Sequence, residues 1–526
     1  MNNLNVNSAA LLRSLVVYAV CVLLSIVVGY MLTNITDYGD RPSMLFICVL
    51  ASLLIFPLLM KWHYPLLLFS WSCPLTLFFL PGHPNLFLPL VAASLSISVV
   101  ERIMNKEQQF LPAAPVRWPL LALLAVVLVT AKLTGGFGLR SMGSEVYGGR
   151  KYVILVIGIL SFFALTARAI PRKYANFYIT LYFAGSFFNF ISDYFPYVPG
   201  PLHFIYWLFP MSDTDIDPMG NIGLQFGVTR MLGTSVTAGA LFYWMLARHG
   251  FRDIFLTNKL WRPLVLGLAF TLMFLGGFRS AIGGALLVFG LIFYLEGMHR
   301  TGVMLAVVLA GVLAGALLVP LTQYLPYTFQ RALAFLPLKV NADVRMDTDG
   351  STQWRLDMWE ALLPEVPKYF WKGKGYAFSA ELFNDMGRNT AFREVIDASQ
   401  NPLALANDFH SGPLSVIIPF GIWGVVVWLW FWAAGFWVVW RNYHYGDPAI
   451  RHINLFLFAS FVAKCISFIF IFGDLVADMS GFAGIIGLSI AMNHGIMRPR
   501  PRLQPAASPA AAPPPLALPA QPAFQR

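Results

Sequence analysis

The sequence predicts an all-α polytopic membrane protein of about fourteen transmembrane helices, with one large loop on its outer side. Two observations support this prediction. First, 58% of the 526 residues are hydrophobic and only 12% are charged, whereas a typical soluble domain is about 25% charged. Second, apolar runs of roughly 17–25 residues, each long enough to cross a bilayer as a helix, recur along the chain. Most of the surface is therefore expected to face lipid.

The candidate spans define one transmembrane domain over residues 1–497. They lie near 11–33, 43–60, 64–81, 86–100, 116–133, 152–168, 174–192, 232–247, 263–278, 281–297, 302–320, 412–440, 452–473 and 479–497. The first is interpreted as a retained span, because its apolar stretch is longer than that of a cleaved signal peptide and no A-x-A-like site follows. The Pro- and Ala-rich tail, 498–526, is expected to be disordered.

Lys and Arg concentrate in every second loop between these spans. The basic loops include Arg102, Arg168, Arg172, Arg248, Arg252, Arg262, Arg300, Arg441, Arg451 and Arg498. The opposite loops are mostly short and poor in Lys and Arg, with Arg140, Arg150 and Lys151 as the exception. By the positive-inside rule, both termini are cytoplasmic. The net charge of +11 thus lies mainly on loops near anionic lipid, and no basic stripe with interleaved aromatics suggests nucleic-acid binding.

The largest outer loop, residues 321–411, contains a predicted short helix. Between Trp354 and Leu363, apolar residues recur at helical spacing, and Pro364 limits the helix. This pattern is typical of an amphipathic helix lying on the membrane surface. It would hold Arg355 near a lipid headgroup. The alternative is an exposed Arg355 paired with an acidic neighbour on the same helix.

Arg279 and His410 are the other two candidates for chemistry. Arg279 lies between two spans at the outer boundary, in the glycine-rich stretch LGGFRSAIGG. An arginine at that depth usually faces an internal cavity, and its planar fork suits a diphosphate; the alternative is snorkelling to lipid headgroups. His410 stands just before the span that starts near Pro413, and an imidazole can act as a general base near neutral pH. Its alternative is a purely structural histidine.

Lys464 lies in the middle of an apolar run and is therefore a candidate for substrate binding. Asp474 and Asp478, in the short outer turn that follows, could face the same site. Lys464 could also be the partner of an internal carboxylate. The remaining alternative is that Lys464 snorkels and the two aspartates are solvated. No H-E-x-x-H motif is present, and neither a metal nor another cofactor is expected.

Several of these residues form a recognisable series. The series consists of Arg230 with Gly233; Arg279 with Ser280 and Ala281; Arg355 with Trp359, followed by Gly373 and Gly375; and His410, followed by Gly421 and Gly424. In this order and on one side of the membrane, it resembles the O-antigen ligase/O-antigen polymerase superfamily of bacterial inner-membrane glycosyltransferases. The resemblance covers residues 225–430.

The resemblance implies a GT-C-like fold that uses an undecaprenyl diphosphate-linked glycan as donor at the periplasmic face, without metal or nucleotide sugar. Arg279 and Arg355 would bind the diphosphate and stabilise the charge that develops on it. His410 would position or deprotonate the acceptor hydroxyl, and transfer would invert the anomeric carbon. Arg230 and Trp359 would contribute to substrate binding. The implied partners are an acceptor glycan or glycolipid, membrane lipids and other polysaccharide-assembly proteins.

The resemblance leaves the acceptor open. The predicted span count exceeds that typical of ligases, which favours a polymerase of O-antigen or exopolysaccharide repeats over a ligase acting on lipid A-core. The residue after His410 is Ser411, where Asn is commoner. A transporter or flippase of the same lipid-linked glycans would need charges on many spans. A protein with only an assembly role would tolerate the loss of Arg279 and His410.

Overall fold

The computed structural model describes residues 22, 25, 57, 59–80, 82–105, 110–138, 147–211, 230–379 and 409–499. Throughout these residues the chain is helical, and the only β-type contacts there are two isolated bridges. Seven of the described helices are long and apolar enough to cross a membrane, and two more, Trp261–Gly276 and Arg279–Leu295, are shorter and apolar. The predicted all-α membrane class is confirmed for the described part.

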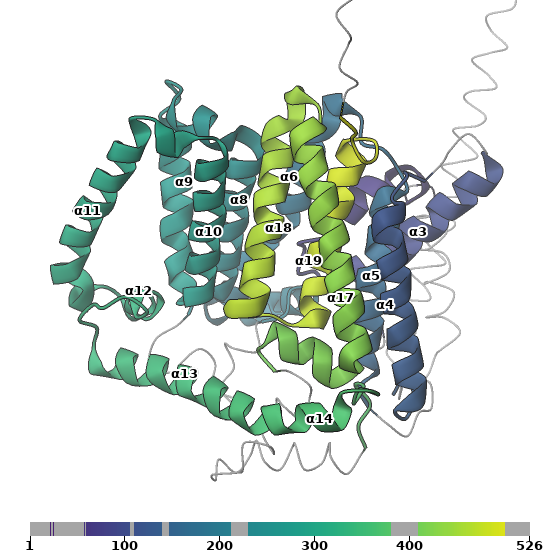
Figure 1. The fold of residues 1–526 in the computed structure, drawn as a ribbon. Helices are drawn as coiled ribbons and strands as arrows, with labels where there is room; N and C mark the ends of the chain where they lie inside the picture. Colours follow the sequence, from purple (N-terminus) through teal and green to yellow (C-terminus); the bar gives the residue numbers. More distant parts are fainter. Residues whose placement is uncertain are drawn as a thin grey trace, which may run out of the picture.

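Most of the described helices run side by side as a bundle (Figure 1). The bundle consists of α3 (Phe87–Met104), α4 (Ala114–Leu133), α5 (Gly149–Thr166), α6 (Ala175–Ala184), α8 (Leu232–Phe255), α9 (Trp261–Leu272), α10 (Arg279–Leu295), α17 (Gly412–Tyr445), α18 (Arg451–Phe470) and α19 (Leu475–Met492). The 3-10 helix η3 (Gly185–Tyr197) continues α6, and η5 (Met273–Gly276) continues α9.

The centre of the bundle is α19, which packs against α5, α17 and α18. Nearly all of its residues are buried. Glycines let neighbouring elements come close: a Cβ at Gly484 would lie 2.8 Å from the ring of Trp71. Small residues at such contacts are typical of packing between membrane helices, where backbones approach closely.

One predicted span is wrong. The helix that contains residues 59–70 ends at Ser70, and the segment predicted as the rest of the span at 64–81 forms turns instead. Thr76 pairs there with Asn85 in an isolated bridge. Pro74 contributes to this outcome, because proline lacks the N–H that a continuing helix needs. The predicted spans at 11–33 and most of 43–60, and the tail at 500–526, lie outside the described residues.

A helical arm crosses one end of the bundle. It consists of α12 (Tyr327–Leu333), α13 (Ala342–Leu362) and α14 (Val366–Tyr369), and α13 lies beneath the upright helices in Figure 1. The predicted helix at 354–363 is thus present, within a longer one. Met358 and Leu362 of α13 are buried in a small cluster with Phe409 and Leu414. This cluster fixes the arm to the start of α17.

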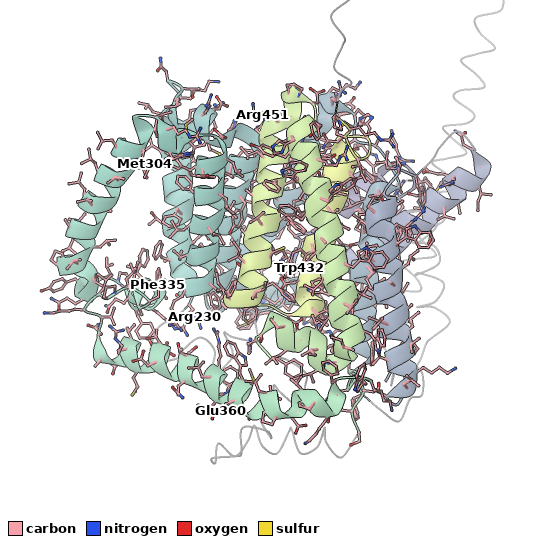
Figure 2. The ribbon with its side chains drawn as sticks, in the orientation of Figure 1. Arg230, Met304, Phe335, Glu360, Trp432 and Arg451 are labelled. Atoms are coloured by element: carbon pink, nitrogen blue, oxygen red, sulfur yellow. The ribbon has the colours of Figure 1, made fainter. Side chains whose placement is uncertain are left out.

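The two ends of the bundle differ in composition. We call the end crossed by α13 the arm end and the opposite end the basic end. Several of the basic loops predicted to be cytoplasmic meet at the basic end, where Arg451 lies, whereas Arg230 lies at the arm end (Figure 2). The described helices therefore agree with the alternation of basic and non-basic loops in the sequence.

Helix α11 (Val303–Leu321) stands apart from the bundle at the left of Figure 1. None of its residues is buried, although it has the highest mean hydropathy, 2.6, of the candidate spans. Because its composition suits hydrocarbon on all sides, α11 is expected to be surrounded by lipid.

Candidate functional site

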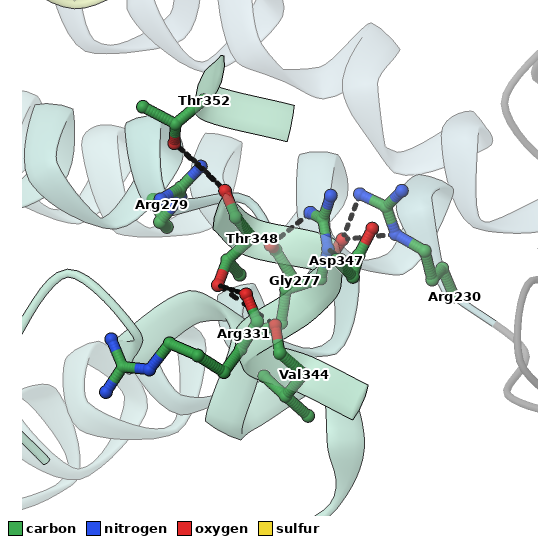
Figure 3. Close-up of polar contacts among 10 residues, drawn as sticks. Arg230, Gly277, Arg279, Arg331, Val344, Asp347, Thr348 and Thr352 are labelled. Atoms are coloured by element: carbon green, nitrogen blue, oxygen red, sulfur yellow. Dashed lines mark hydrogen bonds and ion pairs between the residues drawn. The ribbon is translucent and has the colours of Figure 1, made fainter. Parts of the chain in front are cut away.

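Four arginines from four elements gather at the arm end. We call Arg230, Arg279, Arg331 and Arg355 the arginine cluster. Arg230 precedes α8, Arg279 begins α10, Arg331 lies on α12 and Arg355 on α13. Figure 3 shows the first three around the N-terminal half of α13. An uninterrupted helix at the surface thus connects groups that are distant in sequence.

A backbone carbonyl and a capped helix start fix the position of Arg230. Its guanidinium donates two hydrogen bonds, of 3.1 and 3.0 Å, to the carbonyl oxygen of Gly276. The next turn is fixed by Asp193, whose carboxylate accepts from the N–H groups of Gly233 and Thr234. Asp193 therefore caps the start of α8 from another element. Glycine is needed at 233, because a Cβ there would lie 1.9 Å from the carbonyl oxygen of Asn189.

Arg279 contacts α13 directly. Its guanidinium donates to the hydroxyl oxygen of Thr352 at 3.2 Å and lies 3.4 Å from the carbonyl oxygen of Thr348. The side chain is partly buried. Both contacts are to uncharged oxygens, so neither neutralises the positive charge of Arg279.

Arg331 belongs to the same cluster, but the sequence analysis missed it. Its Nε lies 2.5 Å from the carboxylate of Asp347, and its other nitrogen donates to the carbonyl oxygen of Gly277 at 2.9 Å. Gly277 adopts a left-handed conformation, with φ 66°, that favours glycine. The signal in the sequence is an arginine near the start of the large outer loop, on the side where basic residues are rare.

Asp347 is the acidic partner within the cluster. Burial, followed by the negative charge of Asp347, raises the pKa of Tyr327 to about 12, so this phenol stays neutral. Asp347 and Asp349 have D-x-D spacing, a pattern found in some metal-dependent sugar transferases. The prediction that no metal is bound overlooked this pair. In the described part of the chain, no three His, Cys, Asp or Glu side chains converge as metal ligands.

Arg355 lies on α13, three residues beyond Thr352. Burial and the nearby charges of Arg279 and Arg331 lower its pKa, which indicates three guanidinium groups close enough to repel one another. Its Nε is buried without a hydrogen-bond partner in the described residues. The predicted alternative was an ion pair with Glu360 or Asp357. The described residues show neither pair, and the carboxylate of Asp357 accepts from Gln353 at 2.7 Å.

His410 lies beside Arg355 in space. The guanidinium carbon of Arg355 is 6.0 Å from the ring centre of Phe472, and the imidazole of His410 is 5.1 Å from the same ring. Trp354 contacts the imidazole from the other direction, at 5.5 Å. The backbone of His410 has φ 46°, a conformation that is uncommon outside glycine. The structure therefore brings together Arg279, Arg355 and His410.

Trp359 positions this histidine. The indole N–H donates a 2.9 Å hydrogen bond to the carbonyl oxygen of Phe409, the residue before His410. The predicted role of Trp359 was substrate binding; its observed contact is with the backbone that carries the imidazole.

The glycines of the predicted series join the arm to α17. The N–H groups of Lys374 and Gly375 donate to the carbonyl oxygens of Ile418 and Pro419, and Ile422 donates to that of Phe370. Gly373 and Gly421 have φ of 76° and 62°. A Cβ at either position would lie within 2.5 Å of a backbone oxygen. These glycines are required because two backbones pair where α17 bends.

Residues 264–429 match the family model described as O-antigen ligase. The chain carries a domain of the O-antigen ligase/O-antigen polymerase superfamily. The match runs from α9 into α17 and includes Arg279, Arg331, Arg355 and His410. No curated protein matches the chain. The resemblance inferred from the sequence is confirmed over these residues, whereas Arg230 and Gly233 lie before the matched range.

Beside the O-antigen ligase domain, Lys464 and the two aspartates form a network of their own. The Lys464 ammonium lies 2.6 Å from the carboxylate of Asp478, which also accepts from the N–H of Asp474. Asp474 in turn caps α19 by accepting from Ala477. Of the two alternatives in the sequence analysis, pairing of Lys464 with an internal carboxylate is the one observed. The network supports the turn that carries Phe472, and hence the wall beside His410.

Proposed function

We propose that this protein is a glycosyltransferase that moves a glycan from an undecaprenyl diphosphate-linked donor to an acceptor hydroxyl at the arm end. The protein would lie in the bacterial inner membrane. The arm end would face the periplasm, and both termini would be cytoplasmic. The observation that carries the proposal is the arginine cluster beside His410. Four cations with one ion-paired carboxylate, Asp347, suit a ligand with several negative charges.

The proposed reaction is a direct displacement at the anomeric carbon. The oxygen of the acceptor hydroxyl forms the new bond to this carbon, and the bond from carbon to the diphosphate oxygen breaks. Undecaprenyl diphosphate leaves with the electron pair, and Arg279 and Arg355 stabilise its growing charge. His410 accepts the proton of the acceptor hydroxyl. Attack from the face opposite the leaving group inverts the anomeric configuration, and the residues named require no metal for this step.

Arg331 and Arg230 complete the proposed diphosphate site. Arg331 is oriented by Asp347 and by the carbonyl of Gly277, so part of its fork is fixed before a ligand arrives. Preorganised donors stabilise developing charge better than mobile ones, because they need no reorganisation during the reaction.

The acceptor distinguishes two forms of this reaction. Polymerisation of repeat units, the form favoured by the sequence analysis, uses a second lipid-linked glycan as acceptor. Ligation uses lipid A-core. One of the spans behind the polymerase preference, 64–81, is wrong, and the matched family model is described as a ligase. The ligase is therefore kept as the second candidate.

The test is transfer by the purified protein in lipid vesicles. A ladder of longer glycans from an undecaprenyl diphosphate-linked repeat unit alone, seen by gel and mass spectrometry, identifies a polymerase. Product that forms only when lipid A-core is added identifies a ligase. His410→Ala is expected to lower the rate by about 10²–10⁴-fold while donor binding is kept.

The matched control is Arg345→Ala, since Arg345 is an exposed arginine on α13 whose side chain contacts the carbonyl of Leu338. Wild-type rates in both His410→Ala and Arg279→Ala would rule out this site as the place of reaction. Movement of a fluorescent donor across the vesicle membrane, without product, would identify a transporter instead.

A further inference from the structure

A pocket opens at the arm end, away from the arginine cluster. It has a volume of about 540 Å³ and lies among the outer ends of α3, α5 and α19 and the turn segment that precedes α3. This volume falls in the range of about 300–1,000 Å³ that is usual for small-molecule sites. None of the residues assigned to the proposed reaction lines it.

The lining combines hydrogen-bonding groups from several elements with an apolar wall. The polar groups are Thr76, His83 and Asn85 from the turn segment, Arg150 from α5 and Ser480 from α19. Phe87 provides an aromatic surface. Among the lining residues that the structure describes there is no Asp or Glu, so the charge of Arg150 gives the pocket a positive potential.

His83 at the pocket has an unusual backbone. Its φ is 45°, and it follows Gly82 with φ 77°. Only three described non-glycine residues have positive φ, and a second one is His410. Such conformations cost free energy and cluster at binding and active sites. The turn at Gly82 and His83 places His83 and Asn85 in the same pocket as Arg150.

The pocket and His410 lie on two sides of one turn. Val476 and Ala477, at the start of α19, line the pocket. The adjacent Leu475 donates its N–H to the hydroxyl oxygen of Ser415, which follows His410 by five residues on α17. On the other side of this turn, Phe472 contacts the imidazole of His410. A chain-like ligand could therefore occupy the pocket and extend toward His410 past this turn.

The segment that follows the arm contacts the start of α5 near the pocket. Tyr147 and Phe378 exchange two backbone hydrogen bonds, of 2.9 and 3.2 Å, and their rings stack. Two residues after Tyr147, the N–H of Gly149 donates to the carbonyl oxygen of Gly138, which lines the pocket. The position of the arm and the shape of the pocket are thus linked through the start of α5.

We propose that this pocket is a subsite for the acceptor glycan and binds a hydroxyl-rich saccharide that carries an anionic group. The proposal rests on the proposed function and adds to it the chemistry of the acceptor. Polar groups from three elements suit hydroxyls that point in several directions, Phe87 suits the apolar face of a sugar ring, and Arg150 suits a carboxylate or phosphate substituent. A lipid headgroup would use Arg150 but would not need donors and acceptors on every wall.

The experiment measures the initial rate of transfer as the acceptor concentration varies at saturating donor. Arg150→Gln is expected to raise the acceptor KM by about tenfold or more, since a hydrogen bond to a charged group is lost. The kcat and the donor KM stay unchanged. Ser480→Phe, which fills the pocket from α19, is expected to act in the same direction. Arg345→Gln is the matched control on the same end of the molecule.

An unchanged acceptor KM in both variants overturns the proposal. So does loss of a bound phospholipid from Arg150→Gln, seen by native mass spectrometry, when the acceptor KM does not change. If the wild-type protein shows no transfer, the proposed function fails, and the pocket is tested by binding alone. The probe is then the oligosaccharide released from the lipid-linked repeat unit by mild acid: binding that Arg150→Gln abolishes supports the subsite, and no binding overturns it.

Discussion

The arginines at the two ends of the molecule have different surroundings. At the basic end, Arg168 pairs with Glu101 and Arg172 with Asp447. Arg262 pairs there with Asp253. At the arm end, the ion pair seen between the arginine cluster and the described residues joins Arg331 to Asp347. Arg230 and Arg279 donate there to carbonyl and hydroxyl oxygens.

The difference separates two uses of the same side chain. A guanidinium paired with a carboxylate is electrostatically complete and joins elements of the fold. Guanidinium groups close enough to repel one another destabilise the free protein and gain stability when an anion arrives. The pKa of Arg355 is lowered first by burial and then by the charges of Arg279 and Arg331. The proposed function uses this difference: it places ligand binding at the arm end and gives the paired arginines of the basic end a structural role.

The largest expected effect comes from removing an arginine of the cluster. Arg331→Ala should lower kcat/KM for glycan transfer by about 10²–10³-fold, the usual loss for one preorganised donor to a developing negative charge. The measurement is the rate of product formation in vesicles, with Arg345→Ala as the matched control. Arg331→Lys should recover only part of the rate, because an ammonium cannot contact Asp347 and Gly277 with the same fork. A fully active Arg331→Ala variant would contradict the proposal that the arginine cluster binds the diphosphate.

Removal of an arginine at the basic end should act on stability instead. In Arg262→Ala, the carboxylate of Asp253 loses its arginine partner and keeps only the contact with His249. The side chain of Arg262 is only 8% exposed. Because Asp253 is 44% exposed, the expected loss is about 1–2 kcal/mol rather than that of a fully buried pair. Thermal unfolding in detergent measures it, and transfer per folded molecule should equal that of the wild type. A loss of transfer without a change in stability would contradict the scaffold role.

A smaller effect is expected where the arm positions His410. Trp359→Phe keeps the aromatic packing but removes the hydrogen bond to Phe409, worth about 1 kcal/mol. The transfer rate should fall several-fold, because the imidazole becomes less well placed, while the donor KM stays the same. An increased donor KM with unchanged kcat would instead support the substrate-binding role that the sequence suggested for Trp359.

The helical membrane class could be predicted from the sequence because hydrocarbon imposes a simple rule on length and polarity. The rule fails where an apolar segment is not a helix. Residues 71–80 belong to the predicted span 64–81, yet they form turns. Hydropathy averages over a window and does not register how backbone hydrogen bonds are satisfied within it.

The candidate site could be predicted in part for a related reason. Arg279, Arg355 and His410 stand in a recognisable order along the chain, and the structure brings them together. Arg331 has no such marker, because its place in the cluster depends on Asp347, which is sixteen residues away on another helix. The partner of Lys464 could be narrowed further, to the two aspartates of the turn that follows its span, and the packing of α18 against α19 selects Asp478.

Helix α13 also fixes the distances between the groups that it carries. Asp347, Thr352, Arg355 and Trp359 lie on one uninterrupted helix, and the distance along its axis from the first to the last is about 18 Å at 1.5 Å per residue. One added residue would rotate everything beyond it by roughly 100° about the helix axis. The contacts to Arg331 and to Phe409 could then not form together. In α13, length and register are therefore under tighter constraint than the identity of most of its exposed side chains, and related chains should differ there by substitution rather than by insertion or deletion.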